Sequence, residues 1–249
     1  PVTFGLGVII VGSRQLGLAI LMHEAAHRTL FNNAAINDFV GQYLLAYPTG
    51  TDLYAYRKYH LVHHRHTQQD QDPDLVLSAP FPVSRSSLKR KLIRDLTGQT
   101  GIKQRVFLIQ SALGGRKSNV GTFGFIASHL VILTVCAFLG AWWVYFAMFL
   151  FPILTWFQAV LRIRNIAEHA VVSRDDNPLQ NARTTYANWL ERICVAPYWV
   201  NYHVEHHAYI FIPCYNLKKA HKAMILNGFK DEINTLKNYK QVLQLAAPR

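Results

Sequence analysis

A run of 42 residues without one Asp, Glu, Lys or Arg, over 120–161, most constrains what this chain can fold into. As a helix it would be about 63 Å long at about 1.5 Å per residue, twice the roughly 30 Å hydrocarbon core of a bilayer. The sequence therefore predicts two membrane crossings, at about 122–139 and 143–161, joined near Gly140 to Trp143. The alternative, buried helices of a soluble protein, is disfavoured because so long an uncharged run is hard to bury in 249 residues.

A second apolar run covers 1–30 and predicts one more span, at about 2–22. Arg14 lies inside it. An intramembrane charge is a functional candidate, but this arginine can also snorkel or pair with another helix. The segment 34–48 is too short to span and is expected to be re-entrant or interfacial.

The distribution of charged residues predicts which side of the membrane the polar regions face. The chain has a net charge of +12, and 31–119 holds 12 basic and 6 acidic residues while 162–249 holds 12 and 7. A hairpin between these blocks returns the chain to the side it left, so both are expected to face the cytoplasm. The first span would then start outside. Because the chain begins at Pro1, without an initiator Met, we expect an N-terminal span to be missing; a start codon directly before Pro1 would contradict this.

Basic and apolar residues alternate over 84–117. This pattern predicts amphipathic helices lying on a membrane surface, with a solvated basic linker as the alternative. A basic chain can also bind nucleic acid, but nucleic-acid binding explains neither the apolar spans nor the histidines described next. We therefore expect a membrane protein without a nucleic-acid partner.

Eight of the 12 histidines fall in three clusters with helical spacing, which places each cluster on one helix face. The first begins where the first span ends and the others lie in the two basic blocks, so one membrane face receives all three. His169 follows the hairpin, with Asn165 one turn earlier. His66, His129 and His221 are expected to be ordinary surface or core residues. The clusters are His23 and His27; His60, His63 and His64; and His203, His206 and His207.

So many neighbouring imidazoles would destabilise one another's charged forms and would lack partners if buried neutral. A metal removes both problems, because neutral imidazole is a ligand for Fe, Zn, Cu and Ni. One tetrahedral zinc takes only three or four protein ligands. Nine ligands therefore match two metals of higher coordination number, and two irons that change oxidation state and bind O2 fit an all-nitrogen site.

These motifs resemble the three histidine boxes of the membrane fatty acid desaturase family. His-Glu-Ala-Ala-His at 23–27, His-Leu-Val-His-His at 60–64 and His-Val-Glu-His-His at 203–207 match the boxes in order and separation, with a hairpin between the second and third. Asn-x-x-x-His at 165–169 is similar to a further element of the family. The family usually has two hairpins, whereas the first is a single arm here, which agrees with a missing span.

The resemblance implies one domain over 1–249, an all-α integral membrane fold with a histidine-rich di-iron cap on the cytoplasmic side. All nine histidines would be iron ligands, and Asn165 would reach the metal through water. The implied reaction is O2-dependent desaturation of a fatty acyl chain, acyl-lipid or acyl-CoA, with electrons from a ferredoxin or cytochrome b5 type donor. Relatives that hydroxylate or ketolate lipids or carotenoids are the alternative within the family.

A rival from another class is a membrane zinc protease, because His23-Glu24-Ala25-Ala26-His27 fits H-E-x-x-H with Glu24 as general base. It leaves the other two clusters unexplained. A non-enzymatic metal-binding or transport protein would be expected to place His or acidic residues within its spans to form a path, and 120–161 offers only His129.

Several acids lie beside the histidines. Glu24, Glu168 and Glu205 can accept an N–H from another ligand imidazole and so fix its tautomer. The alternative is solvation or ion pairing, and the candidate partners are Arg57, Arg162 and Arg164. The sequence favours a turn, rather than metal ligation, at Asp70, Asp72 and Asp74.

Overall fold

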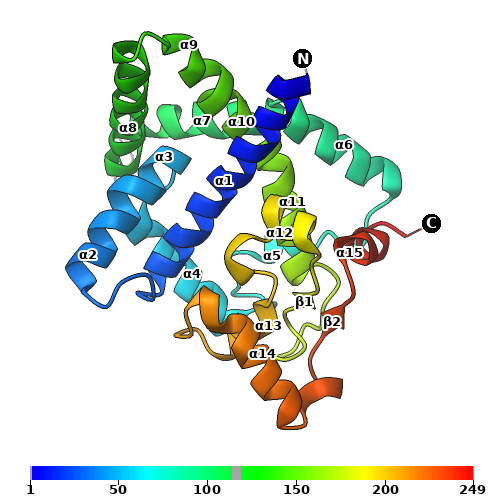
Figure 1. Ribbon diagram of the computed structural model, residues 1–249. Helices are drawn as coiled ribbons and strands as arrows, with labels where there is room; N and C mark the ends of the chain where they lie inside the picture. The colour runs from blue at the N-terminus through cyan, green and yellow to red at the C-terminus, as the bar shows by residue number, and fades with distance from the viewer. Residues whose placement is uncertain (1, 114–118, 249) are drawn as a thin grey trace.

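The computed structural model describes residues 2–113 and 119–248, and the regular structure in these ranges is almost entirely helical. In Figure 1 the long apolar helices occupy the upper part of the molecule, and the short helices and loops of the C-terminal third lie below them. This confirms the prediction of an all-α fold with a separate cap. Within the described ranges, one two-stranded parallel sheet pairs Thr184 with Thr235 and Thr185 with Leu236.

The α-helices are α1 (Val2–Ala26), α2 (Ala34–Phe39), α3 (Tyr47–Thr49), α4 (Leu53–His66), α5 (Leu75–Ser78), α6 (Arg85–Leu96), α7 (Gln99–Leu113), α8 (Asn119–Phe138), α9 (Trp142–Val144), α10 (Phe151–Leu154), α11 (Trp156–His169), α12 (Trp189–Cys194), α13 (His203–Ala208), α14 (Leu217–Leu226) and α15 (Tyr239–Ala246). The π-helical and 3-10 elements are η1 (Val40–Ala46), η2 (Tyr145–Leu150), η3 (Pro197–Trp199), η4 (Cys214–Asn216) and η5 (Phe229–Asp231). The strands are β1 (Thr184–Thr185) and β2 (Thr235–Leu236).

Three helical segments are long and apolar enough to cross a membrane: Val2–Ala26, Gly121–Phe138 and Trp142–His169. They coincide with the three predicted spans. Fewer than half of the residues in the most apolar window of each are buried inside the protein, which leaves an outer surface suited to lipid. The first and third segments extend beyond the predicted ends, and each extension carries candidate metal ligands.

The hairpin turns at Gly140, which has a positive φ of 72° and lies within the predicted interval. A residue with a side chain is disfavoured in that conformation, so glycine suits the turn. The returning arm is less regular than an ideal span. It passes through η2 and breaks at Thr155, where φ is −118° and ψ is −90°, before α11 begins.

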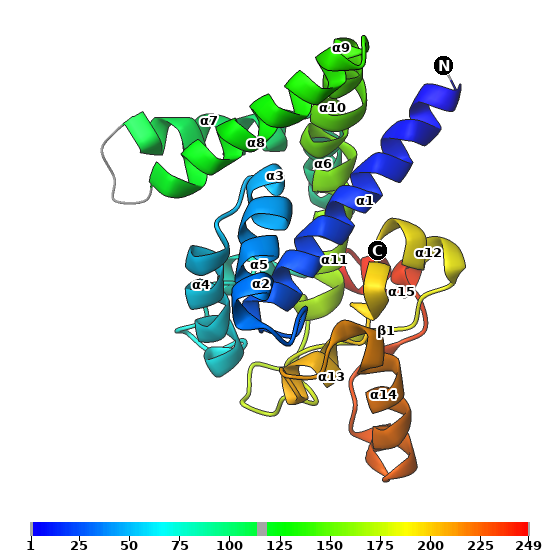
Figure 2. The same cartoon turned by 60° about the vertical axis from the view of Figure 1, so that its left-hand side comes forward.

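The segment expected to be re-entrant or interfacial is a helical stretch, α2 to η1 to α3, that packs beside α1 (Figures 1 and 2). Its outer face exposes Phe39, Tyr43 and Leu44. Arg14, whose role the sequence left open, donates a hydrogen bond to the carbonyl of Ile193 on α12. This arginine therefore joins α1 to the C-terminal third of the chain.

The basic stretch 84–117 forms α6 and α7, and residues 114–117 of it lie outside the described residues. Leu88 of α6 is buried, whereas Lys89 and Arg90 are exposed, so α6 is amphipathic as predicted. Asp95, fully buried near the end of α6, accepts from both Arg162 Nη2 at 2.9 Å and Thr100 Oγ1 at 2.6 Å. The ion pair between Asp95 and Arg162 attaches α6 to α11.

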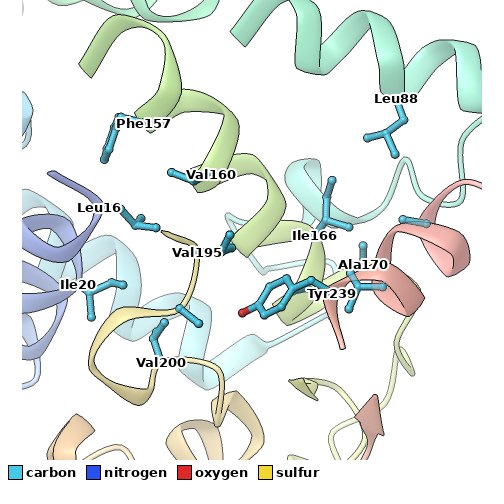
Figure 3. Packing of buried hydrophobic residues seen from close by; sticks show 14 of the residues in the cluster. Leu16, Ile20, Leu88, Phe157, Val160, Ile166, Ala170, Val195, Val200 and Tyr239 are labelled. Atoms are coloured by element: carbon cyan, nitrogen blue, oxygen red, sulfur yellow. The ribbon is translucent and has the colours of Figure 1, made fainter. Parts of the chain in front are cut away.

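The largest buried apolar cluster fixes the helices that carry the site (Figure 3). Leu16 and Ile20 of α1 are fully buried in it. Phe157 and Val160 of α11, the two residues that follow α12 (Val195 and Ala196) and residues of α15 are buried in the same cluster. Burying such a side chain stabilises the fold by about 1.5–3 kcal/mol. The cluster thus sets the position of α1 against α11, about one to two turns before His23 on α1 and about three turns before His169 on α11.

Gly101 provides a test of this packing. A Cβ at Gly101 of α7 would lie 2.6 Å from the carbonyl oxygen and 2.7 Å from the Cα of Leu154. Backbone atoms cannot rotate away, so Gly101→Ala is expected to destabilise the protein by about 1–3 kcal/mol, as overpacking does. The unfolding midpoint in detergent measures this. Gly5→Ala, where a Cβ meets nothing within 4 Å, is the control; equal midpoints for both variants would contradict the contact.

Candidate metal centre

Four separated segments bring the nine predicted ligand histidines together. α1 carries His23 and is followed at once by His27, and α11 ends on His169. In both views, α4 and α13 lie close to the C-terminal ends of α1 and α11 (Figures 1 and 2). These two helices carry the remaining six, which are His60, His63, His64, His203, His206 and His207.

Arg57 joins the first two segments. Its Nε donates to the carbonyl of Ala26 at 2.9 Å and its Nη2 to that of Ala25 at 2.8 Å, while the guanidinium also pairs with Asp38. The last carbonyls of a helix lack intrahelical partners, so this side chain of α4 caps α1. As a result His27 faces α4, with its ring centroid 4.9 Å from that of His60.

The imidazoles form two groups whose ligating atoms lie within 4.8 Å of one another. The first group is His23, His27, His60, His64 and His206. The second group is His63, His169 and His207. His203 adjoins the second group, because its Nε2 lies 2.9 Å from His169 Nε2 and 3.1 Å from His207 Nε2. Together they account for every predicted histidine ligand.

Nitrogen spacing shows that these residues fit metal ions. His64 Nε2 lies 3.0 Å from His60 Nε2 and 3.1 Å from His206 Nε2, and an Nε2 carries at most one proton, so hydrogen bonding accommodates only one such contact at His64. Two ligands at right angles on a metal, with bonds of about 2.1 Å as for zinc, would be about 3 Å apart. Among the described residues, both ring nitrogens of His23 and the Nε2 of His27 are buried without a hydrogen-bond partner. A metal would satisfy the Nε2 atoms, while Nδ1 of His23 lies 3.4 Å from Glu24 Oε1.

Burial keeps the imidazoles neutral. Desolvation, and then the charges of the neighbouring imidazoles, holds the pKa of His60, His206 and His207 well below the usual value. The pKa values of His27 and His64 are lowered by the same two causes. The neutral ring is the form that binds a metal, so the site needs no deprotonation at neutral pH.

Asp72 contacts a candidate metal ligand, a role that the sequence analysis did not assign to it. Its Oδ1 accepts from His63 Nδ1 at 2.8 Å and from Asp74 N at 2.8 Å, and its Oδ2 accepts from Gln68 N at 2.8 Å. Burial raises its pKa, but the bonds from His63, Gln68 and Asp74 outweigh this and keep the pKa below the usual value. The predicted turn is present, and it also aims a carboxylate at His63, which leaves Nε2 of that ring for a metal.

Glu24 is held by the protein rather than free to act as a base. Its Oε1 lies 3.4 Å from Nδ1 of the adjacent His23, and its Oε2 accepts from Cys214 N at 2.8 Å and Thr29 Oγ1 at 3.0 Å. The general base of an H-E-x-x-H protease must instead reach a water on the metal. The arrangement favours a structural role for this carboxylate.

Glu168 combines the two roles that the sequence left open. Its Oε1 lies 3.5 Å from His203 Nδ1 and 2.7 Å from Arg164 Nε. The carboxylate is thus placed between a candidate ligand and a buried cation. Arg57 and Arg162, the other arginines considered as partners, pair with aspartates instead.

Glu205 corrects the sequence prediction. The sequence left open a contact with a ligand imidazole, solvation, or an ion pair with an arginine. Its carboxylate is instead fully buried, and in the described part of the chain its side-chain partners are Thr184 and His221. His221, expected to be an ordinary residue in a lysine-rich segment, is buried. Neither position carries a local signal for this pairing, because 16 residues separate them.

The other two histidines stay outside the centre, as predicted. His66 belongs to neither group of candidate ligands. His129 is buried, with Nδ1 2.7 Å from Tyr145 OH and Nε2 3.2 Å from the carbonyl of Pro48. It is a core histidine with both nitrogens paired.

A cavity of about 210 Å³ opens onto the second group. Its lining includes the predicted Asn165 and the ligand candidates His63, His169 and His203, together with Arg164. A water needs only about 10–15 Å³ of such space and two to four polar partners. The cavity therefore has room for water between Asn165 and the second group.

Comparison with known proteins gives one consistent result. The sequence matches the family described as fatty acid desaturase over residues 1–231. It is 27% identical over 235 residues to dihydrorhizobitoxine desaturase of Bradyrhizobium elkanii, covering 88% of this chain and 67% of that protein. It is also 27% identical over 247 residues to sn-1 oleoyl-lipid 12-desaturase of a Synechocystis species, covering 90% and 68%.

Proposed function

Because this chain belongs to the fatty acid desaturase family and is therefore an oxidoreductase, we propose that it is an O2-dependent di-iron enzyme that introduces a double bond into a fatty acyl chain. The observation that carries the proposal is the division of nine buried or partly buried imidazoles into two adjacent groups, each supplied by several helices. One zinc would use only three or four of them. Two irons use all nine.

Different residues of the chain would have different roles at this site. The first group would hold one iron with five imidazoles, and the second would hold the other with four imidazoles and a water kept by Asn165. When bound, the irons supply the O2 activation that breaking an unactivated C–H bond requires. Asp72 and Glu168 keep the Nδ1 protons of His63 and His203, so that the Nε2 atoms stay available.

An acyl lipid is the substrate class that suits the surroundings of the site. Of the three helices able to cross a membrane, Val2–Ala26 and Trp142–His169 carry the candidate ligands His23 and His169 at their C-terminal ends. An apolar cleft of about 830 Å³ is lined by residues of α1, η1 and α8, including Leu18, Tyr43 and Val131. Its size falls within the range of ligand pockets, and its lining suits a hydrocarbon chain. We therefore favour acyl-lipid or acyl-CoA desaturation over hydroxylation or ketolation of a lipid or carotenoid.

Electrons would come from a ferredoxin or cytochrome b5 type donor on the cytoplasmic side, where the positive-inside tendency puts the basic blocks and the histidines. The two blocks carry most of the net charge of +12. Acidic donors are steered to such a surface.

Expression of the gene in a host with simple lipids tests the reaction. We expect new fatty acids that lack two hydrogens, detected by mass spectrometry of total fatty acids and carotenoids, and about two irons per purified chain. A product that gains oxygen would identify a hydroxylase or ketolase instead. Activity of the protein loaded with zinc alone would refute the mechanism and revive the protease alternative.

A further inference from the structure

Glu205 forms a hydrogen-bonded network that the metal centre itself does not use. The residue is fully buried in α13, between two candidate ligands. Its Oε1 accepts from His221 Nδ1 at 2.6 Å, and its Oε2 accepts from Thr184 Oγ1 at 2.5 Å. The two donors belong to α14 and β1, so one carboxylate ties α13 to both.

The network leaves His221 with one orientation. Because its Nδ1 faces a carboxylate, that nitrogen is the donor to Glu205, and Nε2 lies at hydrogen-bond distance, 3.0 Å, from Tyr186 OH. The ring of Tyr202 packs against it with centroids 5.1 Å apart. His221 is therefore a buried histidine whose two nitrogens are both used to hold Glu205 in place.

α13 needs such support because it has only six residues. An isolated helix of that length is unstable in water, so its position depends on tertiary contacts. Thr184 contributes a second bond, since its Oγ1 also accepts from Val204 N at 3.2 Å. The position of α13 matters for both metals, because His206 belongs to the first group and His207 to the second.

Glu205 differs in its partners from the three buried carboxylates that adjoin the metal centre. Asp72, Glu24 and Glu168 each lie within 3.5 Å of an Nδ1 of a candidate ligand. Glu205 instead binds His221 and Thr184, neither of which belongs to the two groups. Its effect is on a whole helix rather than on the tautomer of one ring.

We propose that His221 is a positioning residue for the third histidine cluster. Through Glu205 it holds α13 where its imidazoles reach both metals. The proposal rests on the di-iron function and adds a residue that is not itself a ligand. It assigns a role to α14, which carries His221 and none of the candidate ligands.

The test compares His221→Leu with His221→Gln in the purified full-length protein. Leucine removes the donor to Glu205, and we expect iron loss to a chelator to become about 10–100-fold faster, the usual effect of losing a partner outside the ligands. Glutamine keeps an N–H donor and is expected to restore most of the retention. The readouts are iron per chain, its release rate and the spectroscopic signature of the bound metal.

His129→Leu is the matched control. It also removes a buried histidine with two hydrogen-bond partners, but one paired to Tyr145 and Pro48 away from the ligands. We expect it to lower the unfolding midpoint without faster iron release. The proposal is overturned if His221→Leu keeps iron as the parent protein does, or if His129→Leu loses it equally fast.

The same experiment separates this proposal from the function. A parent protein that holds zinc rather than iron would refute the di-iron function, while zinc release from the two His221 variants would still decide the positioning role. A parent protein that holds no metal overturns both.

Discussion

Replacing His64 by alanine is expected to remove iron from the first group and to abolish desaturation. His64 Nε2 lies 3.0 Å from His60 Nε2 and 3.1 Å from His206 Nε2, at the middle of that group. Loss of a ligand should exceed the roughly 10–100-fold loss of metal affinity or activity seen when only an outer partner is removed. Iron per chain and unsaturated product in the host's lipids measure the effect.

The matched control for this change is His66→Ala. His66 lies on the same helix two residues later and belongs to neither group. We expect this variant to keep about two irons and full activity, and both variants to insert into the membrane, because neither change touches an apolar span. Activity that survives replacement of His60, His64, His203 and His207 together would rule out the mechanism.

Replacing Asp72 by asparagine is expected to weaken metal binding at the second group by about 10–100-fold. The carboxylate accepts from His63 Nδ1 at 2.8 Å, and an amide of the same shape lacks the charge that makes this bond strong and fixes the ring. Titration of the apo protein with iron would show a second site of reduced affinity. When iron is limiting, the variant would also form less product than the parent protein, because fewer of its second sites would be filled.

Asp70→Asn provides the comparison, since Asp70 lies in the same turn but is exposed. It removes the same charge from the same loop, so it isolates the contact with His63 from the general electrostatics of the turn. Equal iron affinity in the two variants would mean that Asp72 only shapes the loop. Unfolding midpoints should be measured for both, because Asp72 also accepts backbone N–H groups of Gln68 and Asp74.

The membrane part of the fold is predictable from sequence because its signal is local. An uncharged run long enough for two crossings can fold in few ways, and the structure has α8 and the returning arm joined at Gly140. The irregular parts of the returning arm have no comparable signal within the segment itself. The break at Thr155 occurs in an uncharged stretch, three residues after Pro152, and the uncharged run of 120–161 continues through it without interruption.

The histidine clusters are also local, but their division between two metals is not. Helical spacing predicts one direction for each cluster, yet the structure assigns His60 and His64 to the first group and His63 to the second. Neighbouring residues on a helix are about 100° apart, so His63 and His64 face different neighbours once α4 lies between the two groups. The histidines of α13 are divided in the same way, because His206 belongs to the first group and His207 to the second.

The sequence by itself was enough to predict the helical fold class, the apolar segments long enough to span a membrane and a set of candidate metal ligands, because each prediction depends on residue type and on spacing within one helix. Only the tertiary structure decided which residues support those ligands. Arg57 on the end of α1, Asp72 on His63 and His221 on Glu205 are pairs that join separate segments. Side chains at such separations meet only after the chain has packed, so no pattern within one segment specifies them.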